Sequence, residues 1–66
     1  MINIQKKRKL AGLTQQALAE KLKEKGFNID RSTVAKWETD KAYPRIEKLL
    51  ALAEIFDCPV NELLSA

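Results

Sequence analysis

Residues 14–38 read TQQALAEKLKEKGFNIDRSTVAKWE, and this stretch decides the fold. Thr14 favours the position before a helix, because its hydroxyl accepts a hydrogen bond from a free backbone N–H of the first turn. Leu18 and Leu22 follow at a spacing of four, which places them on one helix face. The pattern predicts a helix over 15–25, ended by the glycine that follows it.

A second helix is predicted over 31–39, with Asp30 as its N-cap. Val34 and Trp37 lie three apart, so they share one face of this helix. We predict that this face is the inner one, because a large apolar side chain at helical spacing, such as Trp37, more often belongs to the core than stacks on a base. The small side chain of Ala19 on the preceding helix lets the second helix cross it closely. We therefore expect a helix that is anchored at Val34 and Trp37 and stands out from the body.

The outer face of this second helix presents Arg31, Ser32 and Lys36. A helix exposed in this way fits the major groove of DNA, which is about 12 Å wide. Arg31 has the geometry to pair with guanine through two hydrogen bonds. Gln15 begins the other helix, where free backbone amides and the helix dipole favour a phosphate.

The rest of the chain adds three predicted helices and no strand. The first starts at Ile4 with Asn3 as its cap, and the others cover 45–56, with Pro44 at the entrance, and 60–64. The predicted apolar stripe of the fourth helix contains Ile46, Leu49, Leu50, Leu52, Ala53 and Phe56. The predicted fold is all-α, one compact five-helix domain over 1–66, with a helix-turn-helix over about 14–39.

Charge is distributed unevenly along the 66 residues. The net charge is +3, but residues 1–41 carry ten Lys and Arg against five Asp and Glu, which is +5, and residues 42–66 carry two against four, which is −2. A basic front half suits a surface that meets phosphate on one side. Lysine-rich helices that merely keep a protein soluble give the same charge, so the charge alone leaves both readings open.

Composition excludes several classes of function. The chain has no His and one Cys, Cys58, so we expect no disulfide within it, no zinc site of the Cys/His kind, no His-based catalysis and no cofactor. We read Cys58 as a small apolar residue rather than a redox switch. No apolar stretch is long enough to span a bilayer and no leader pattern opens the sequence, so we expect a cytoplasmic protein that is not an enzyme.

Six segments, in this order and spacing, resemble the Cro/repressor-type helix-turn-helix family, often called XRE-like or lambda-repressor-like. They are GLTQ at 12–15, LAEKL at 18–22, RSTVAKWE at 31–38, KAYP at 41–44, LLALA at 49–53 and VNELL at 60–64. The resemblance covers almost the whole chain. It implies a prokaryotic or phage transcriptional regulator, a repressor that binds a palindromic double-stranded operator as a homodimer through the major groove.

The resemblance also implies roles for individual residues. The positions that reach base edges are Arg31, Ser32 and Lys36, and the positions near the DNA backbone are Gln15, Thr33, Thr39, Lys41, Tyr43 and Arg45. Family members commonly pair an Arg of the first helix with a Glu that ends the recognition helix, here Arg8 and Glu38. The dimer surface is expected at the last helix and the loop before it, with Phe56, Val60 and Leu64 as candidates.

Two alternatives and one departure from the family's pattern stay open. Tyr43 either hydrogen-bonds a phosphate or covers the core beside Pro44. The segment 23–30 is longer than the family's usual turn, and we expect about one extra turn at the end of the helix over 15–25 and a wider connection. The same fold can serve a protein-binding adaptor, such as an antitoxin or antirepressor, instead of a DNA-binding regulator.

Overall fold

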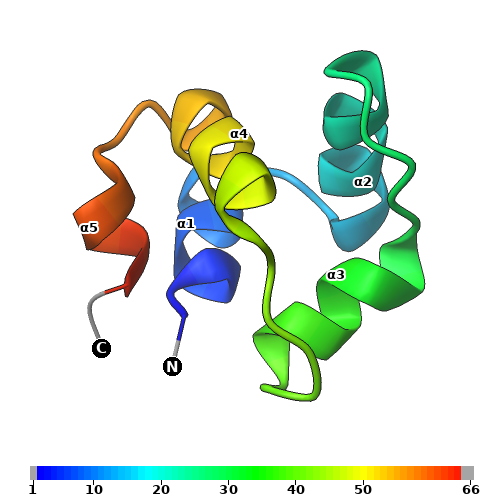
Figure 1. Cartoon of the computed structure of the whole chain (residues 1–66), viewed down its shortest axis with the longest axis horizontal. Coiled ribbons are helices and arrows are strands. Elements are labelled where there is room, and N and C mark those ends of the chain that lie inside the picture. Colours follow the sequence, from blue (N-terminus) through cyan, green and yellow to red (C-terminus); the bar gives the residue numbers. More distant parts are fainter. Residues whose placement is uncertain (1, 65–66) are drawn as a thin grey trace.

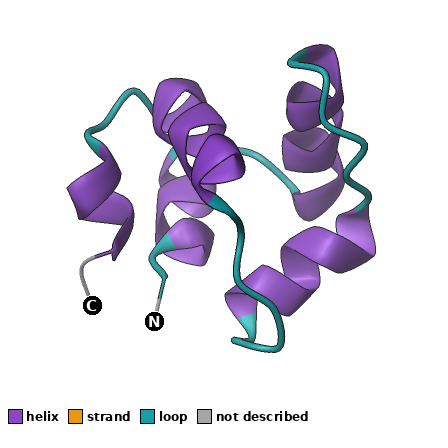
Figure 2. Cartoon of the chain, viewed as in Figure 1, coloured by secondary structure: helices purple, strands orange, loops and turns teal. Residues whose placement is uncertain are grey.

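The computed structural model describes residues 2–64, which form helices joined by loops, with no strand among them (Figure 2). The helices are α1 (Ile4–Leu10), α2 (Gln15–Glu24), α3 (Arg31–Glu38), α4 (Ile46–Phe56) and α5 (Val60–Leu64). α2 and α3 lie on one side of the molecule and α5 on the other, with α1 and α4 between them (Figure 1). The all-α, five-helix prediction is confirmed. None of these helices is long and apolar enough to cross a membrane.

The N-terminal caps of α2 and α3 are those predicted. The Thr14 hydroxyl accepts the N–H of Ala17 at 3.0 Å, and the Asp30 carboxylate accepts the N–H of Thr33 at 2.9 Å. Each bond satisfies a donor that has no partner inside its helix. Asn3 occupies the N-cap position of α1 but makes no side-chain cap hydrogen bond, so α1 lacks this stabilisation.

α2 ends where Gly26 takes a positive φ of 97°, a conformation that glycine adopts without strain. Its N–H donates to the carbonyl of Lys23 at 2.9 Å, and the next N–H, of Phe27, donates to Leu22 at 3.0 Å. These bonds close the helix in a Schellman motif. The helix therefore stops at Glu24, one residue before the predicted limit.

The connection from α2 to α3 occupies residues 25–30 and carries apolar side chains of its own. Ile29 is buried in the core and Phe27 packs against it half-buried. The Lys48 ammonium lies 6.0 Å from the centre of the Phe27 ring, within the range of a cation–π contact. The long connection is thus packed against the body of the domain.

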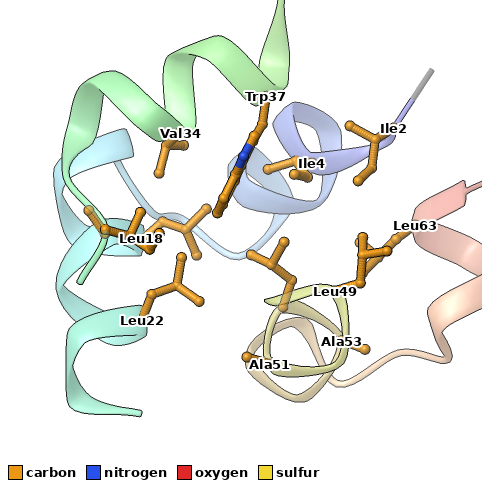
Figure 3. Packing of buried hydrophobic residues seen from close by; sticks show 13 residues of the cluster. Ile2, Ile4, Leu18, Leu22, Val34, Trp37, Leu49, Ala51, Ala53 and Leu63 are labelled. Carbon is orange, nitrogen blue, oxygen red and sulfur yellow. The ribbon is translucent and has the colours of Figure 1, made fainter. Parts of the chain in front are cut away.

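Trp37 lies at the centre of the core, between side chains from α1, α2 and α4 (Figure 3). Val34 is one turn away on the same face of α3 and points toward Leu18 (Figure 3). Both α3 residues are buried, and Ala19 of α2 is fully buried. The anchoring of α3 predicted from the sequence is confirmed. Full burial of an apolar side chain such as that of Val34 stabilises the folded state by about 1.5–3 kcal/mol.

α4 differs from the prediction in its start and in its buried face. It begins at Ile46, with Arg45 as the N-cap residue, because the backbone of Arg45 is extended. Ile46 and Leu50 of the predicted stripe are 57% and 53% exposed, whereas Ala51 is buried. Ile46 and Leu50 are four residues apart, so they share one face, and this face turns away from the core. The buried apolar face of α4 is therefore narrower than the sequence pattern predicted.

α5 packs beside α1 near the two ends of the chain (Figure 1). The N–H of Asn3 donates to the carbonyl of Leu63 at 2.7 Å, and Leu63 is fully buried. The ammonium of Lys7 pairs with Glu62 at 3.0 Å. Contacts distant in sequence therefore attach the short last helix to α1.

Candidate nucleic-acid interface

α3 lies at one edge of the molecule and crosses α2 steeply (Figure 1). Val34 and Trp37 face the core, whereas Arg31, Ser32 and Lys36 are exposed on the outside of the helix. The structure thus brings the three predicted base-contacting residues together on one solvent face. The dimensions of a single exposed helix suit the major groove.

Asp30 organises the first turn of α3 through one carboxylate oxygen. Oδ1 accepts the Thr33 N–H and the hydroxyls of Ser32 and Thr33, each at 2.9 Å. These hydrogen bonds, with that from the Thr33 backbone contributing most, lower the pKa of Asp30 from 3.8 to about 2. The carboxylate is therefore ionised at neutral pH and acts only as an acceptor.

The segment after α3 presents the polar residues expected near the DNA backbone. Lys41 and Arg45 are exposed, and Tyr43 is 59% exposed. Pro44, not Tyr43, is buried against the domain. Tyr43 therefore does not cover the core, and more than half of its surface is open to solvent.

A buried ion pair joins α1 to the end of α3. Arg8 donates from Nε to Glu38 at 2.7 Å and from Nη2 to the other oxygen at 3.3 Å, the two-point geometry that strengthens such pairs. The side chains of Arg8 and Glu38 are 11% and 3% exposed. Arg8 also donates from Nη1 to the carbonyl of Leu13 at 2.8 Å. The predicted Arg8–Glu38 pair is confirmed.

Glu38 of the same pair also binds Gln15, a contact that was not predicted from the sequence. The Gln15 amide donates from Nε2 to Oε1 of Glu38 at 3.1 Å. Gln15 begins α2, so the bond links the start of α2 to the end of α3. The two residues are 23 positions apart in the sequence, so no local sequence pattern predicts their contact. The amide keeps a second N–H that Glu38 does not use.

Two predicted backbone-contacting threonines have internal partners. The Thr33 hydroxyl donates to Asp30, and the Thr39 hydroxyl donates to the carbonyl of Ala35 at 2.9 Å. Thr39 is the C-cap residue of α3 and is exposed, whereas Thr33 is half-buried. A tight Asp-x-Ser-Thr spacing of this kind signals such hydroxyl bonds in sequence.

The positive charges of this edge are not neutralised within the domain. Within residues 2–64, ion pairs engage Lys7, Arg8 and Lys25, and none engages Arg31, Lys36 or Lys41. The acidic partners of the two exposed pairs, Glu62 and Glu54, belong to the acidic back half of the chain. The exposed cations of α3 and the following segment remain available to an anionic partner.

A helix supported by a second helix, with its first turn and outer face exposed, is the arrangement of DNA-binding helix-turn-helix domains. The helix-turn-helix family model matches residues 4–63, and this chain belongs to that family. This confirms the resemblance to Cro/repressor-type domains.

Among curated proteins, the chain is similar to the HTH-type transcriptional activator BcrR of Enterococcus faecalis, with 40% identity over 53 residues. The match covers 80% of this chain and 24% of that protein, so the chain spans about a quarter of its relative's length. No solved structure matches the chain.

Proposed function

We propose that this chain is a sequence-specific, double-stranded DNA-binding transcription regulator that inserts α3 into the major groove. The observation that carries the proposal is the exposure of Arg31, Ser32 and Lys36 on a helix whose other face is anchored by Val34 and Trp37. Such a helix reaches base edges without losing its packing. Membership of the helix-turn-helix family and the similarity to a protein named as a transcriptional activator support the same function.

Base readout is assigned to Arg31, Ser32 and Lys36. A two-point Arg–guanine pair discriminates against the wrong base by about 1–3 kcal/mol. Arg31 lies in the first turn of α3 and is exposed, so its long side chain extends from the helix end that leads into the groove. Substitution of Arg31→Ala relaxes specificity at one base pair in each half-site. An unchanged base preference of this variant in sequence selection contradicts the assignment.

The DNA backbone is assigned to residues on both sides of α3: Gln15, Thr33, Thr39, Lys41, Tyr43 and Arg45. Lys41 and Arg45 supply charge, and the Tyr43 hydroxyl and the second N–H of Gln15 supply donors. Thr33 and Thr39 contribute least, because each exchanges an internal hydrogen bond for one to phosphate.

The functional unit is proposed to be a homodimer on a palindromic operator, with two copies of α3 one helical turn of DNA apart, about 34–36 Å. Apolar surface for the dimer lies at α4 and α5. Leu50 and Leu64 are exposed, and Leu50 belongs to an open groove between the two helices, lined by Leu50, Ala53, Glu54, Asp57, Cys58, Pro59 and Val60. Sedimentation that finds only monomers, both free and on DNA, contradicts the dimer.

Regulation is proposed to be repression, in which the bound dimer blocks polymerase by occupying the promoter. The relative's name describes an activator, so a promoter–reporter assay decides the direction of regulation. Falling reporter output on expression of this chain supports repression, and rising output supports activation.

The experiment that tests DNA binding is a salt titration with a selected operator and a scrambled duplex of equal length. A protein that neutralises several phosphates loses affinity linearly with the logarithm of salt concentration, with a slope of about −0.9 per phosphate. Absence of binding to any duplex at 50 mM salt refutes the proposal and favours the adaptor function.

A further inference from the structure

Ser32 is the one uncharged residue among the proposed base-contacting side chains, and its hydroxyl already has a partner. Its Oγ lies 2.9 Å from Oδ1 of Asp30, the oxygen that also accepts the N–H and the hydroxyl of Thr33. An N-terminal cap needs only the bond from the Thr33 N–H. The Ser32 bond is additional to the cap, and it links the hydroxyl of a proposed base-contacting residue to the exposed carboxylate that begins the helix.

The direction of the Ser32–Asp30 bond follows from the charge of Asp30. An ionised carboxylate has no proton to give, so the serine hydroxyl is the donor. A hydroxyl has one proton and two acceptor lone pairs. With its proton held by Asp30, Ser32 presents only lone pairs to whatever faces it.

We propose that Asp30 is a specificity-determining positioning residue, which fixes Ser32 as a hydrogen-bond acceptor toward the major groove. This inference rests on the proposed function, in which α3 reads base edges. Bases differ in what they offer there: adenine N6 and cytosine N4 are amino donors, whereas guanine O6 and thymine O4 are acceptors. The base that faces Ser32 is therefore adenine or cytosine, and guanine and thymine are disfavoured.

The reverse arrangement is disfavoured by the strength of the existing bond. For Ser32 to donate to guanine or thymine, its proton has to leave a carboxylate for a neutral carbonyl. Hydrogen bonds to ionised acceptors are roughly twice as strong as bonds between neutral groups. A single net hydrogen bond corresponds to a preference of roughly two- to tenfold.

The test is selection of bound sequences from a random duplex pool by the parent protein and four variants. Ser32→Ala removes the hydroxyl itself, so the position at which this variant loses its base preference is the one that Ser32 faces. At that position the parent protein is expected to select adenine or cytosine on one strand. Asp30→Asn and Asp30→Ser retain a side chain that caps α3, but neither has a carboxylate to hold the Ser32 proton. Both are expected to admit guanine or thymine at that position and to reduce the preference to less than about twofold.

Asp40→Asn is the matched control. It makes the same chemical change just after the end of α3, where the backbone has a φ of 60° that Asn also tolerates. This variant is expected to keep the parent preference, which separates the role of Asp30 from a general change of charge. Circular dichroism of each variant verifies that the helices are retained.

Three results overturn the inference while leaving DNA binding intact. They are selection of guanine or thymine at the Ser32 position by the parent protein, an unchanged preference in both Asp30 variants, and an unchanged preference in Ser32→Ala. Failure of the parent protein to bind any duplex is a different result, and it refutes the proposed function itself.

Discussion

α3 and α5 are both attached to α1 by an ion pair from neighbouring residues, yet the two attachments differ in kind. Arg8 reaches Glu38 of α3, whose side chain is 3% exposed, and Lys7 reaches Glu62 of α5, whose side chain is 49% exposed. The first pair is shielded from water and branches to Gln15 and to the Leu13 carbonyl. The second is open to solvent.

The difference shows where the domain needs a fixed geometry. Exposed ion pairs contribute about 0–1 kcal/mol, whereas removal of one partner from a buried pair costs about 3–5 kcal/mol because the other charge stays buried. The α3 junction, which is the pair of Arg8 with Glu38, positions the helix proposed to read DNA. The α5 junction, which is the pair of Lys7 with Glu62, attaches a short helix that lies on the opposite side of the molecule (Figure 1).

The largest effect is expected from Glu38→Ala. It leaves the Arg8 guanidinium buried without its partner, and destabilises the domain by about 3–5 kcal/mol. In a domain this small, such a loss approaches the whole free energy of unfolding, which is about 5 kcal/mol at the low end for natural domains. Urea unfolding followed by circular dichroism measures the loss.

Glu62→Ala is the matched control for this change, because it removes a carboxylate that also pairs with α1. A comparable loss of stability in the two variants would contradict the distinction between the junctions.

A double substitution, Arg8→Met with Glu38→Leu, separates the stability of the α3 junction from its positioning role. Replacing a buried pair with apolar side chains is often neutral or stabilising. The free energy of unfolding of this variant is therefore expected to lie within about 2 kcal/mol of that of the parent protein. Gln15 loses its acceptor and is no longer held. Affinity for operator DNA is expected to fall by about 1 kcal/mol in a binding titration. Full affinity in a stable double variant would show that Glu38 does not position Gln15.

Gln15→Ala tests the contact that the α3 junction is proposed to support. The amide is uncharged and releases no counterion, so the variant is expected to lose about 0.5–1.5 kcal/mol of binding with an unchanged salt slope. Lys41→Ala is the comparison, because it is expected to reduce the magnitude of the slope by about 1. Equal changes of slope in the two variants would remove the distinction between a held amide and a free charge.

The smallest effect is expected at the α5 junction, from Glu62→Gln. The hydrogen bond to Glu62 raises the pKa of Lys7 above 10.5, so the pair stabilises the folded state below that pH. This stabilisation is lost as pH rises through the folded-state pKa of Lys7. At pH 7 in low salt, the midpoint temperature of thermal unfolding is expected to be slightly lower for this variant than for the parent protein. The difference should vanish at 1 M salt, where the screening length is about 3 Å. A difference that persists at 1 M salt would mean that the α5 junction is not an ordinary exposed pair.

Most of the fold could be predicted from the sequence, because helix caps, helix-ending glycines and helical periodicity involve residues only a few positions apart. Thr14 and Asp30 cap helices through hydrogen bonds to residues three positions away, and Gly26 ends α2 with bonds of the same short range. Val34 and Trp37 share a face because the helical repeat places them there. The Arg8–Glu38 pair is distant in sequence, and only the family resemblance indicated it.

What the sequence by itself determined is therefore the set of helices and the outer face of α3, since caps, periodicity and turns act within a few residues. What only the tertiary structure decided are contacts between distant segments. Gln15 binds Glu38, and the Ile46–Leu50 side of α4 stays exposed, because neighbouring helices determine which apolar and polar groups are covered. Helical periodicity groups residues on a face, but burial of that face depends on what packs against it.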